Sequence, residues 1–259
     1  MRRTEPGGGI RRHRVGRSLS VAVAAVALGS GLAACSAAPS APSDSTDSVL
    51  MGHGAAHLPN TTASDWVTYA DHVVVVSATA ETEIAPTEEE LARGEGVIGR
   101  TVDLKVEKVL WSRPGASRPA PAVWAYDAVG WQFSDGDTDN RLRMALAEQP
   151  RVEPGHWYVM ALAWEDAVCS GEVAEPGQWR GLGEGSEVPF DGGVLGRGEL
   201  EGRTVTPAPA LVAEPGEDGS LEREVAGQGA DALVRALREA VPQSPTFQAR
   251  PQEPRDTCA

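Results

Sequence analysis

The stretch TVDLKVEKVLW (residues 101–111) decides the fold class more clearly than any other part of the chain. From Val102 onward, apolar residues alternate with charged ones, which is the period-two pattern of a strand with one buried face. Beyond Glu107 the apolar side shifts to Val109 and Trp111. This change of phase predicts a β-bulge near Glu107, in a strand that belongs to a sheet.

Several other segments have the composition of strands. They are rich in β-branched and aromatic residues and are bounded by Gly and Pro. The longer ones are residues 72–84, 123–133 and 156–164, and brief strands are expected near Val188, Val194 and Leu200.

Two segments have the pattern of helices. Asp139 or Asn140 could cap a short helix that ends at Pro150, and residues 230–241 carry a clear 3.6-residue periodicity. A third, single turn is expected from Ser64 or Asp65 onward. We therefore predict a mainly β fold, either an antiparallel barrel (OB-like) or a sandwich, with a short inserted helix and a C-terminal helix.

Three short motifs add a resemblance. Ala70-Asp71 leads into a valine run, Val109-Leu110-Trp111 ends a strand, and residues 155–159 read Gly-His-Trp-Tyr-Val. Over residues 70–165 these motifs resemble bacterial secreted domains with an OB-like barrel, similar to the netrin/tissue-inhibitor module. In the tissue inhibitors the functional group is an N-terminal cysteine packed on the barrel. Here Cys35 lies far upstream, so inhibitor activity is not carried over.

The N-terminus has the pattern of a secretory signal. An arginine-rich start precedes an uncharged run, residues 19–32, that is Ala-rich and interrupted by Gly29-Ser30-Gly31. A retained transmembrane helix is the alternative, but a bilayer core needs about 20 apolar residues. Export through the twin-arginine route is less favoured, because the apolar pair expected after Arg11-Arg12 is missing.

Leu32-Ala33-Ala34-Cys35 resembles the lipobox of bacterial lipoprotein precursors. The resemblance implies cleavage before Cys35, lipidation of its sulfur, and a protein held on the outer face of the cell membrane. The scarcity of lysine is typical of a GC-rich genome such as that of an actinobacterium. The expected organisation is a signal peptide (1–34), a lipidated cysteine with a flexible tether (35–62), one β-rich domain (63–242) and a Pro-rich tail (243–259).

The charge excludes one class of partner. The whole chain has a formal charge of −14, and removing the leader with its six arginines and one acid leaves the rest near −19. Nucleic acid binding depends on cationic side chains that meet phosphates, so it is not expected. The expected partners are the membrane, through the lipid, and an envelope protein or glycan.

Two cysteines follow the proposed anchor, Cys169 and Cys258. In an oxidising compartment an even pair favours a disulfide. Because Cys258 is next to last, a free thiol at a frayed terminus is the alternative.

Two groups of residues could bind a metal. Asp135, Asp137 and Asp139 alternate as in a calcium loop, but the position that needs a bidentate Glu is Leu146. The alternative is a solvated turn that leads into the helix cap. The second group, Met51, His53 and His57, has donors suited to copper but lies in the expected tether. We therefore expect no resident cofactor, with calcium as the open alternative.

The remaining candidate binding residues are aromatic or acidic. Trp131 and Trp179 lie near loops, where an exposed ring could stack on a sugar or peptide, although core positions are the commoner use of such residues. Glu184 and Asp191 are the acids of a Gly-rich stretch, residues 181–202, that could form a functional rim.

Motifs of hydrolases are missing from the sequence: it contains neither G-x-S-x-G nor H-E-x-x-H. We therefore expect a lipid-anchored, non-catalytic binding or interaction module. A cell-surface hydrolase that uses acids of the Gly-rich rim, and a metal-binding lipoprotein, are the alternatives.

Overall fold

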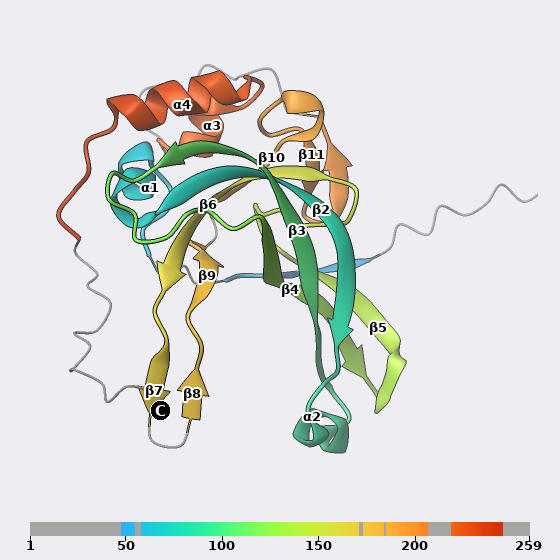
Figure 1. The fold of residues 1–259 in the computed structure, drawn as a ribbon. Coiled ribbons are helices and arrows are strands. Elements are labelled where there is room, and N and C mark those ends of the chain that lie inside the picture. Colours follow the sequence, from blue (N-terminus) through green and yellow to red (C-terminus); the bar gives the residue numbers. More distant parts are fainter. Residues whose placement is uncertain (1–47, 55–57, 171–172, 184, 207–218, 246–259) are drawn as a thin grey trace, which may run out of the picture. The chain divides into compact units, whose positions relative to one another are not determined.

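A computed structural model describes residues 48–54, 58–170, 173–183, 185–206 and 219–245 of the chain. The elements in chain order (Figure 1) are β1 (Val49–Gly52), α1 (Ala63–Tyr69), β2 (His72–Ile84), α2 (Glu88–Arg93), β3 (Gly96–Ser112), β4 (Val123–Ser134), β5 (Asp137–Leu146), β6 (Trp157–Glu165), β7 (Val168–Ser170), β8 (Val173–Glu175), β9 (Gln178–Gly181), β10 (Glu187–Pro189), a 3₁₀ turn (Asp191–Gly193), β11 (Gly198–Leu200), β12 (Arg203–Val205), α3 (Leu221–Val225) and α4 (Ala230–Glu239).

The main sheet is mixed and has eight strands, in the order β1-β5-β4-β3-β2-β6-β10, with β9 also paired to β6. Its pairs are antiparallel except β1–β5, which is parallel. No closed barrel is found among the described strands. The mainly β class is thus correct, while the all-antiparallel expectation is wrong at the β1 edge.

The valine run of β2 explains why the sheet lies between two cores. Val73 and Val75 belong to one buried cluster, and Val74 and Val76 belong to another, because successive side chains of a strand point to opposite faces. Strand β6 divides in the same way. A strand that is buried on both faces has a continuous apolar run rather than an alternating one.

Helices cover the first of these faces. Figure 1 shows α3 and α4 lying together along one side of the sheet, with α1 beside them. Trp66 of α1, Leu221 of α3 and Leu233 of α4 are buried in the same cluster as Val73 and Val75. Within the described ranges, none of the helices has the length and apolar character that crossing a bilayer requires.

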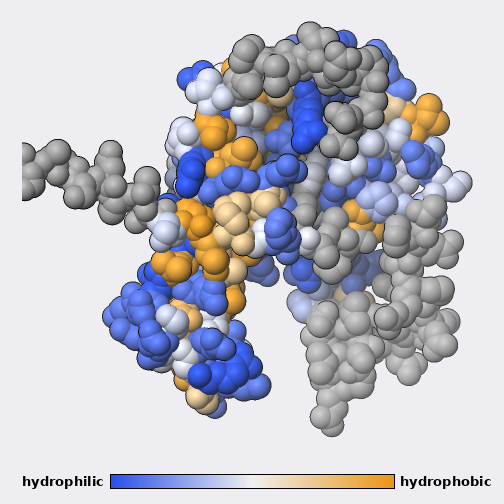
Figure 2. Space-filling model, turned by 180° about the vertical axis from the view of Figure 1, so that it is seen from behind, coloured by the Kyte–Doolittle hydropathy of each residue, from blue (hydrophilic) through white to orange (hydrophobic). Residues whose placement is uncertain are grey.

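The second core fills the inner side of a curled sheet. The Trp124 indole of β4 donates to the carbonyl of Trp179 in β9 (3.0 Å), and the Tyr126 hydroxyl donates to Glu187 in β10 (2.6 Å). These bonds connect strands that are distant in the pairing order, so the sheet curves around this core. Figure 2 shows a face on which hydrophilic residues alternate with several separate groups of apolar residues.

The bulge predicted from the sequence is confirmed. Val75 pairs with Lys108 and Val76 pairs with Val106, so Glu107 is the extra residue. The strands expected at 72–84, 123–133 and 156–164 and the C-terminal helix are also present, within one to two residues at each end.

The short inserted helix expected between Asp139 and Pro150 is wrong. Residues 137–146 form β5, which pairs with β4 through a two-residue turn at Asp135-Gly136. Both turn residues have positive φ (58° and 69°), as a type I′ hairpin turn requires, and Asp-Gly is a preferred sequence for it.

Three smaller expectations are also wrong. Residues 49–52 of the expected tether form β1, which pairs with β5. The N-cap of α1 is Thr62 rather than Ser64 or Asp65, with Asp65 as its reciprocal capping partner. Near Val194 the chain forms a 3₁₀ turn rather than a strand.

Candidate functional site

The two tryptophans proposed as exposed stacking surfaces are partly buried and have neighbours. The guanidinium groups of Arg141 and Arg151 lie 4.4 Å and 5.1 Å from the Trp131 ring. The Trp179 ring packs edge-on against Trp164, with centroids 5.4 Å apart. The two tryptophans therefore belong to different clusters, Trp131 with arginines and Trp179 with other aromatic rings.

Of the two acids of the expected Gly-rich rim, only Asp191 lies within the described residues. Asp191 accepts hydrogen bonds from His156 Nδ1 (2.6 Å) and from the Trp157 backbone N–H (2.9 Å). It thereby fixes the start of β6. Glu184 lies outside the described residues.

The predicted calcium residues lie in the β4–β5 hairpin. Asp135 accepts from the Asn140 side chain (3.2 Å), and Asp137 accepts from the Asp139 backbone N–H (2.9 Å). These bonds are local to the hairpin. Across the described ranges, no group of three or more His, Cys, Asp or Glu residues is arranged to hold a metal ion.

The other candidate residues fall partly outside the description. Met51 is exposed on β1 and His53 follows that strand, whereas His57 is outside the described residues. Cys35 and Cys258 are also outside them, and Cys169 is in β7. The lipidation site and the disulfide stay predictions.

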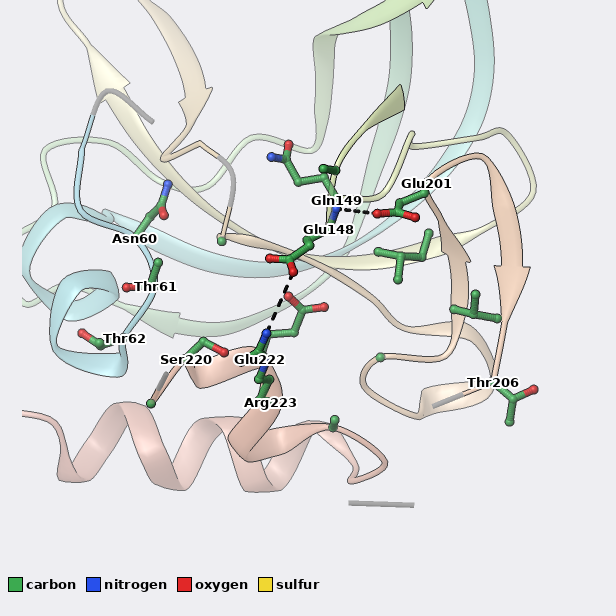
Figure 3. A pocket seen from close by; sticks show the side chains of 17 residues that line it. Asn60, Thr61, Thr62, Glu148, Gln149, Glu201, Thr206, Ser220, Glu222 and Arg223 are labelled. Carbon is green, nitrogen blue, oxygen red and sulfur yellow. Dashed lines mark hydrogen bonds and ion pairs between the residues drawn. The ribbon is translucent and has the colours of Figure 1, made fainter. Parts of the chain in front are cut away.

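A pocket of 740 Å³ is the strongest candidate site in the described part of the chain (Figure 3). It lies between the start of α1, the β5–β6 connection, the β11–β12 hairpin and α3. Its polar lining residues are Asn60, Thr61, Thr62, Glu148, Gln149, Glu201, Thr206, Ser220, Glu222 and Arg223.

One wall of the pocket is fixed by the chain that leads into α1. Asn60 is 2 % exposed; its Nδ2 donates to the Leu182 carbonyl (3.1 Å) and its own carbonyl accepts from the Trp66 indole (2.7 Å). The Leu221 backbone N–H donates to the Thr61 carbonyl (2.7 Å). The start of α3 is thus tied to this wall.

The opposite wall consists of two turns that hold one another. The Glu148 backbone N–H donates to Glu201 Oε1 (2.7 Å), and the Glu201 N–H donates to the Gln149 carbonyl (2.8 Å). Glu148 and Glu201 both have positive φ, 61° and 54°. Non-glycine residues in this conformation cost free energy and are found disproportionately at functional sites.

Glu222 is the acid whose ionisation the pocket alters most. Burial on α3, and then the nearby carboxylate of Glu148, raise its pKa to about 7, while Arg223 acts in the opposite direction. Figure 3 shows the Glu148 and Glu222 carboxyl groups pointing toward one another from opposite walls. The Arg223 guanidinium lies 4.0 Å from Glu148 Oε1, and both of these side chains are largely exposed at the mouth.

Gln149 contributes a buried amide to the pocket. The residue is 7 % exposed, and its side chain makes no hydrogen bond with the described residues. A buried amide without a partner costs about 1–3 kcal/mol. The pocket therefore holds a polar group that a ligand or an ordered water could satisfy.

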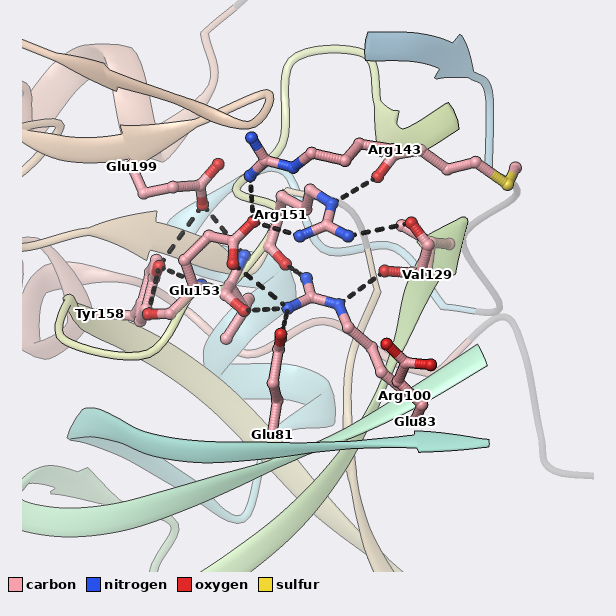
Figure 4. Close-up of polar contacts among 12 residues, drawn as sticks. Glu81, Glu83, Arg100, Val129, Arg143, Arg151, Glu153, Tyr158 and Glu199 are labelled. Atoms are coloured by element: carbon pink, nitrogen blue, oxygen red, sulfur yellow. Dashed lines mark hydrogen bonds and ion pairs between the residues drawn. The ribbon is translucent and has the colours of Figure 1, made fainter. Parts of the chain in front are cut away.

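A second polar cluster lies next to this wall and is centred on two buried arginines (Figure 4). The fully buried Arg100 side chain pairs with Glu81 (2.6 Å) and Glu153 (3.6 Å) and donates to the Val129 carbonyl (2.8 Å). Arg151, 2 % exposed, also pairs with Glu153.

The pKa of Glu153 depends on two opposing effects in this cluster, burial and the neighbouring guanidinium groups. Burial alone raises it, but the Arg151, Arg143 and Arg100 guanidinium groups hold it below its ordinary value. Every charge in the group has a partner, which is the condition for burying charge without a large penalty. The cluster thus positions the β5–β6 connection, which carries Glu148 and Gln149, rather than opening to a ligand.

Sequence reasoning missed the residues that line the pocket. The pattern before Pro150 predicts a helix at the position of Glu148 and Gln149, and Glu222 lies in a short helix without strong periodicity. One signal was available: Thr62-Ala63-Ser64-Asp65 has the Ser/Thr-x-x-acid spacing of a capping box, which marks a helix start there.

Comparison with known proteins gives no relative: no family model, no curated protein and no solved structure matches the chain.

Proposed function

We propose that the chain is a lipid-anchored, extracytoplasmic binding module of the cell envelope that acts without catalysis. Cys35, behind the Arg-rich and apolar leader, supports the anchor. The observation that carries the binding role is the polar pocket between α1, α3 and the β11–β12 hairpin. The partner of the protein is an envelope protein or glycan. The strong negative charge of the chain disfavours binding to nucleic acid.

The chemistry of the pocket supports binding more than turnover. Its described lining includes serine and threonine hydroxyls but no histidine, lysine or cysteine. A hydroxyl nucleophile needs an adjacent base, and a nucleophile–base–orienter arrangement is the usual signature of covalent catalysis. The described pocket therefore offers hydrogen bonds and charge rather than an activated nucleophile.

The position of β1 shortens the tether. Residues 36–48 separate Cys35 from Val49, where β1 begins. A tether of this length, of the kind that the sequence predicts, has a root-mean-square reach of about 20 Å. The domain is thus held close to the outer leaflet, within reach of partners at the membrane surface.

A Cys35→Ser variant tests the anchor and the partner together. The full chain is expressed with its leader in a bacterial host; wild type is expected in the membrane fraction, and the variant in the medium. The secreted variant then serves as bait for an envelope extract, with a Glu148→Gln/Gln149→Met double variant as control. If a component of the extract is captured by the Cys35→Ser bait and not by the double variant, the result supports the proposal. If the two baits capture it equally, the assignment of the pocket is wrong.

A hydrolase is the second candidate, and one observation favours it. A carboxyl group with a pKa near 7 opposite a second carboxylate is the pairing that general acid–base catalysis uses. The acids concerned are Glu148 and Glu222 rather than the expected Glu184 and Asp191. If a captured glycan or peptide is cleaved by wild type and only bound by Glu222→Gln, the protein is an enzyme.

A further inference from the structure

We propose that the pocket binds a small organic cation, whose primary ammonium group lies between the carboxylates of Glu148 and Glu222. This inference rests on the proposed binding function and adds the chemical class of the ligand.

The charge of the lining favours a cation. Its described acids are Glu148, Glu201 and Glu222, and its described cation is Arg223 alone, which already lies 4.0 Å from Glu148. A concave site with one sign of charge attracts ligands of the opposite sign.

The hydrogen-bonding groups favour a ligand with several donors. The Asn60 amide uses one of its two N–H donors for the Leu182 carbonyl, so its second N–H and its Oδ1 remain. The Thr62 hydroxyl is occupied by Asp65 in the capping box. The three lining carboxylates accept only, and an ammonium group offers them three donors.

The buried amide of Gln149 is the independent sign of a ligand. It lines the pocket and makes no hydrogen bond with the described residues, although it is 93 % buried as judged by its 7 % exposure. An amide both donates and accepts. It would therefore recognise a polar group on the same ligand that carries the ammonium, which makes the ligand larger than a bare ion.

The size of the pocket points the same way. A volume of 740 Å³ falls in the range of small-molecule sites. The described residues contain no group of three acids, histidines or cysteines arranged around a metal ion. A hydrated calcium ion is thus a poor match, whereas a polar amine of several carbon atoms fits.

Matched probes test this inference on the full chain that carries Cys35→Ser. The probes are lysine, glucosamine and 1,5-diaminopentane, each compared with its N-acetylated form, and calcium chloride. We expect at least one amine to bind with a Kd below 1 mM by calorimetry and to shift the backbone amide resonances of Gln149 and Ser220. Acetylation should weaken that binding at least tenfold. Equal binding of the acetylated form, no binding of any amine, or calcium binding that shifts the same resonances would each overturn the inference.

Four variants separate recognition from folding. Glu222→Gln and Glu148→Gln should each weaken the amine at least fivefold, while Glu224→Gln, on α3 but outside the lining, should not. Gln149→Met should lose binding yet unfold at the same or a higher temperature, because the substitution removes an unpaired buried amide. A Gln149→Met variant that binds as wild type contradicts the role of the amide.

The pH dependence gives a further readout. The groups that face Glu222 are Glu148 from the β5–β6 connection and Arg223 from α3 itself. Because the ammonium favours the ionised carboxyl, affinity should fall about tenfold between pH 8 and pH 5.5, and it should be nearly constant for Glu222→Gln. If the amine-binding tests fail while the Cys35→Ser bait still captures an envelope component through the pocket, the ligand class is wrong and the proposed binding function is retained.

Discussion

At the scale of single residues, Glu222 and Arg100 illustrate two opposite treatments of charge. Glu222 is partly buried with no cation strong enough to offset its desolvation, so its pKa rises to about 7. Arg100 is fully buried but has carboxylates and carbonyls around its guanidinium. The surroundings of Glu222 therefore make its carboxyl group titratable near neutral pH, whereas the partners of Arg100 hold its guanidinium in place.

The raised pKa of Glu222 predicts a pH-dependent stability. A carboxyl with a folded-state pKa above its unfolded value stabilises the fold when protonated, and this stabilisation is lost as pH rises from about 4.5 to about 7. Glu222→Gln should thus raise the free energy of unfolding at pH 8 by up to about 3 kcal/mol and leave it unchanged at pH 4. Urea unfolding at both pH values measures this difference, and Glu224→Gln is the control. An equal effect of Glu222→Gln at the two pH values would contradict the assigned pKa.

The burial of Arg100 predicts a large loss of stability on its removal. Arg100→Leu removes the cation that pairs with Glu81 and takes the guanidinium donor away from the Val129 carbonyl, so it should cost about 3–5 kcal/mol. The matched control is Arg141→Leu, which breaks the more exposed Arg141–Glu83 pair and should cost less than about 1 kcal/mol. Chemical denaturation of both variants measures the two losses. A loss below 1 kcal/mol for Arg100→Leu would show that the cluster is not tightly formed.

At the scale of elements, the long strands β2, β3, β4 and β6 could be predicted from the sequence, whereas β1 and the segment after Gly136 could not. Alternation identified β3 and its bulge at Glu107, and a valine run identified β2. Residues 139–150 carry Leu142, Ala145 and Leu146 at spacings that suit a helix, but pairing with β4 overrides this local preference. The Asp135-Gly136 dipeptide was the better guide, because its turn type joins two strands.

The β4–β5 hairpin predicts a specific effect of its turn. Asp135 has φ of 58°, a conformation that Asn and Asp tolerate and β-branched residues do not. Asp135→Asn should change the free energy of unfolding by less than about 0.5 kcal/mol, and Asp135→Val should lower it by about 1–2 kcal/mol. Thermal unfolding of the two variants measures this contrast. If both variants lose stability equally, the contribution of the carboxylate outweighs that of the turn conformation.

At the scale of the whole molecule, the pocket could not be predicted because its walls come from four distant parts of the chain. Asn60, Gln149, Glu201 and Glu222 meet through tertiary packing, and no local pattern connects them. The signal peptide proposed for residues 1–34, in contrast, is predicted from one contiguous sequence pattern.

Strand β1 predicts where the folded domain begins. A chain that starts at Ser48 keeps β1, and a chain that starts at His53 loses its pairing with β5 and the partial burial of Val49 and Leu50. The shorter chain should be less stable by about 2 kcal/mol. Its Tm should be lower by roughly 5 °C. Equal Tm values for the two chains would show that residues 49–52 do not contribute to the stability of the folded domain.

The anchored state itself is tested most directly by the mass of the N-terminal peptide of protein extracted from membranes. The account predicts a peptide that begins at Cys35 and carries a diacylglyceryl group on its sulfur, with residues 1–34 absent. A peptide that retains those residues, or an unmodified Cys35, would contradict the lipid-anchored function.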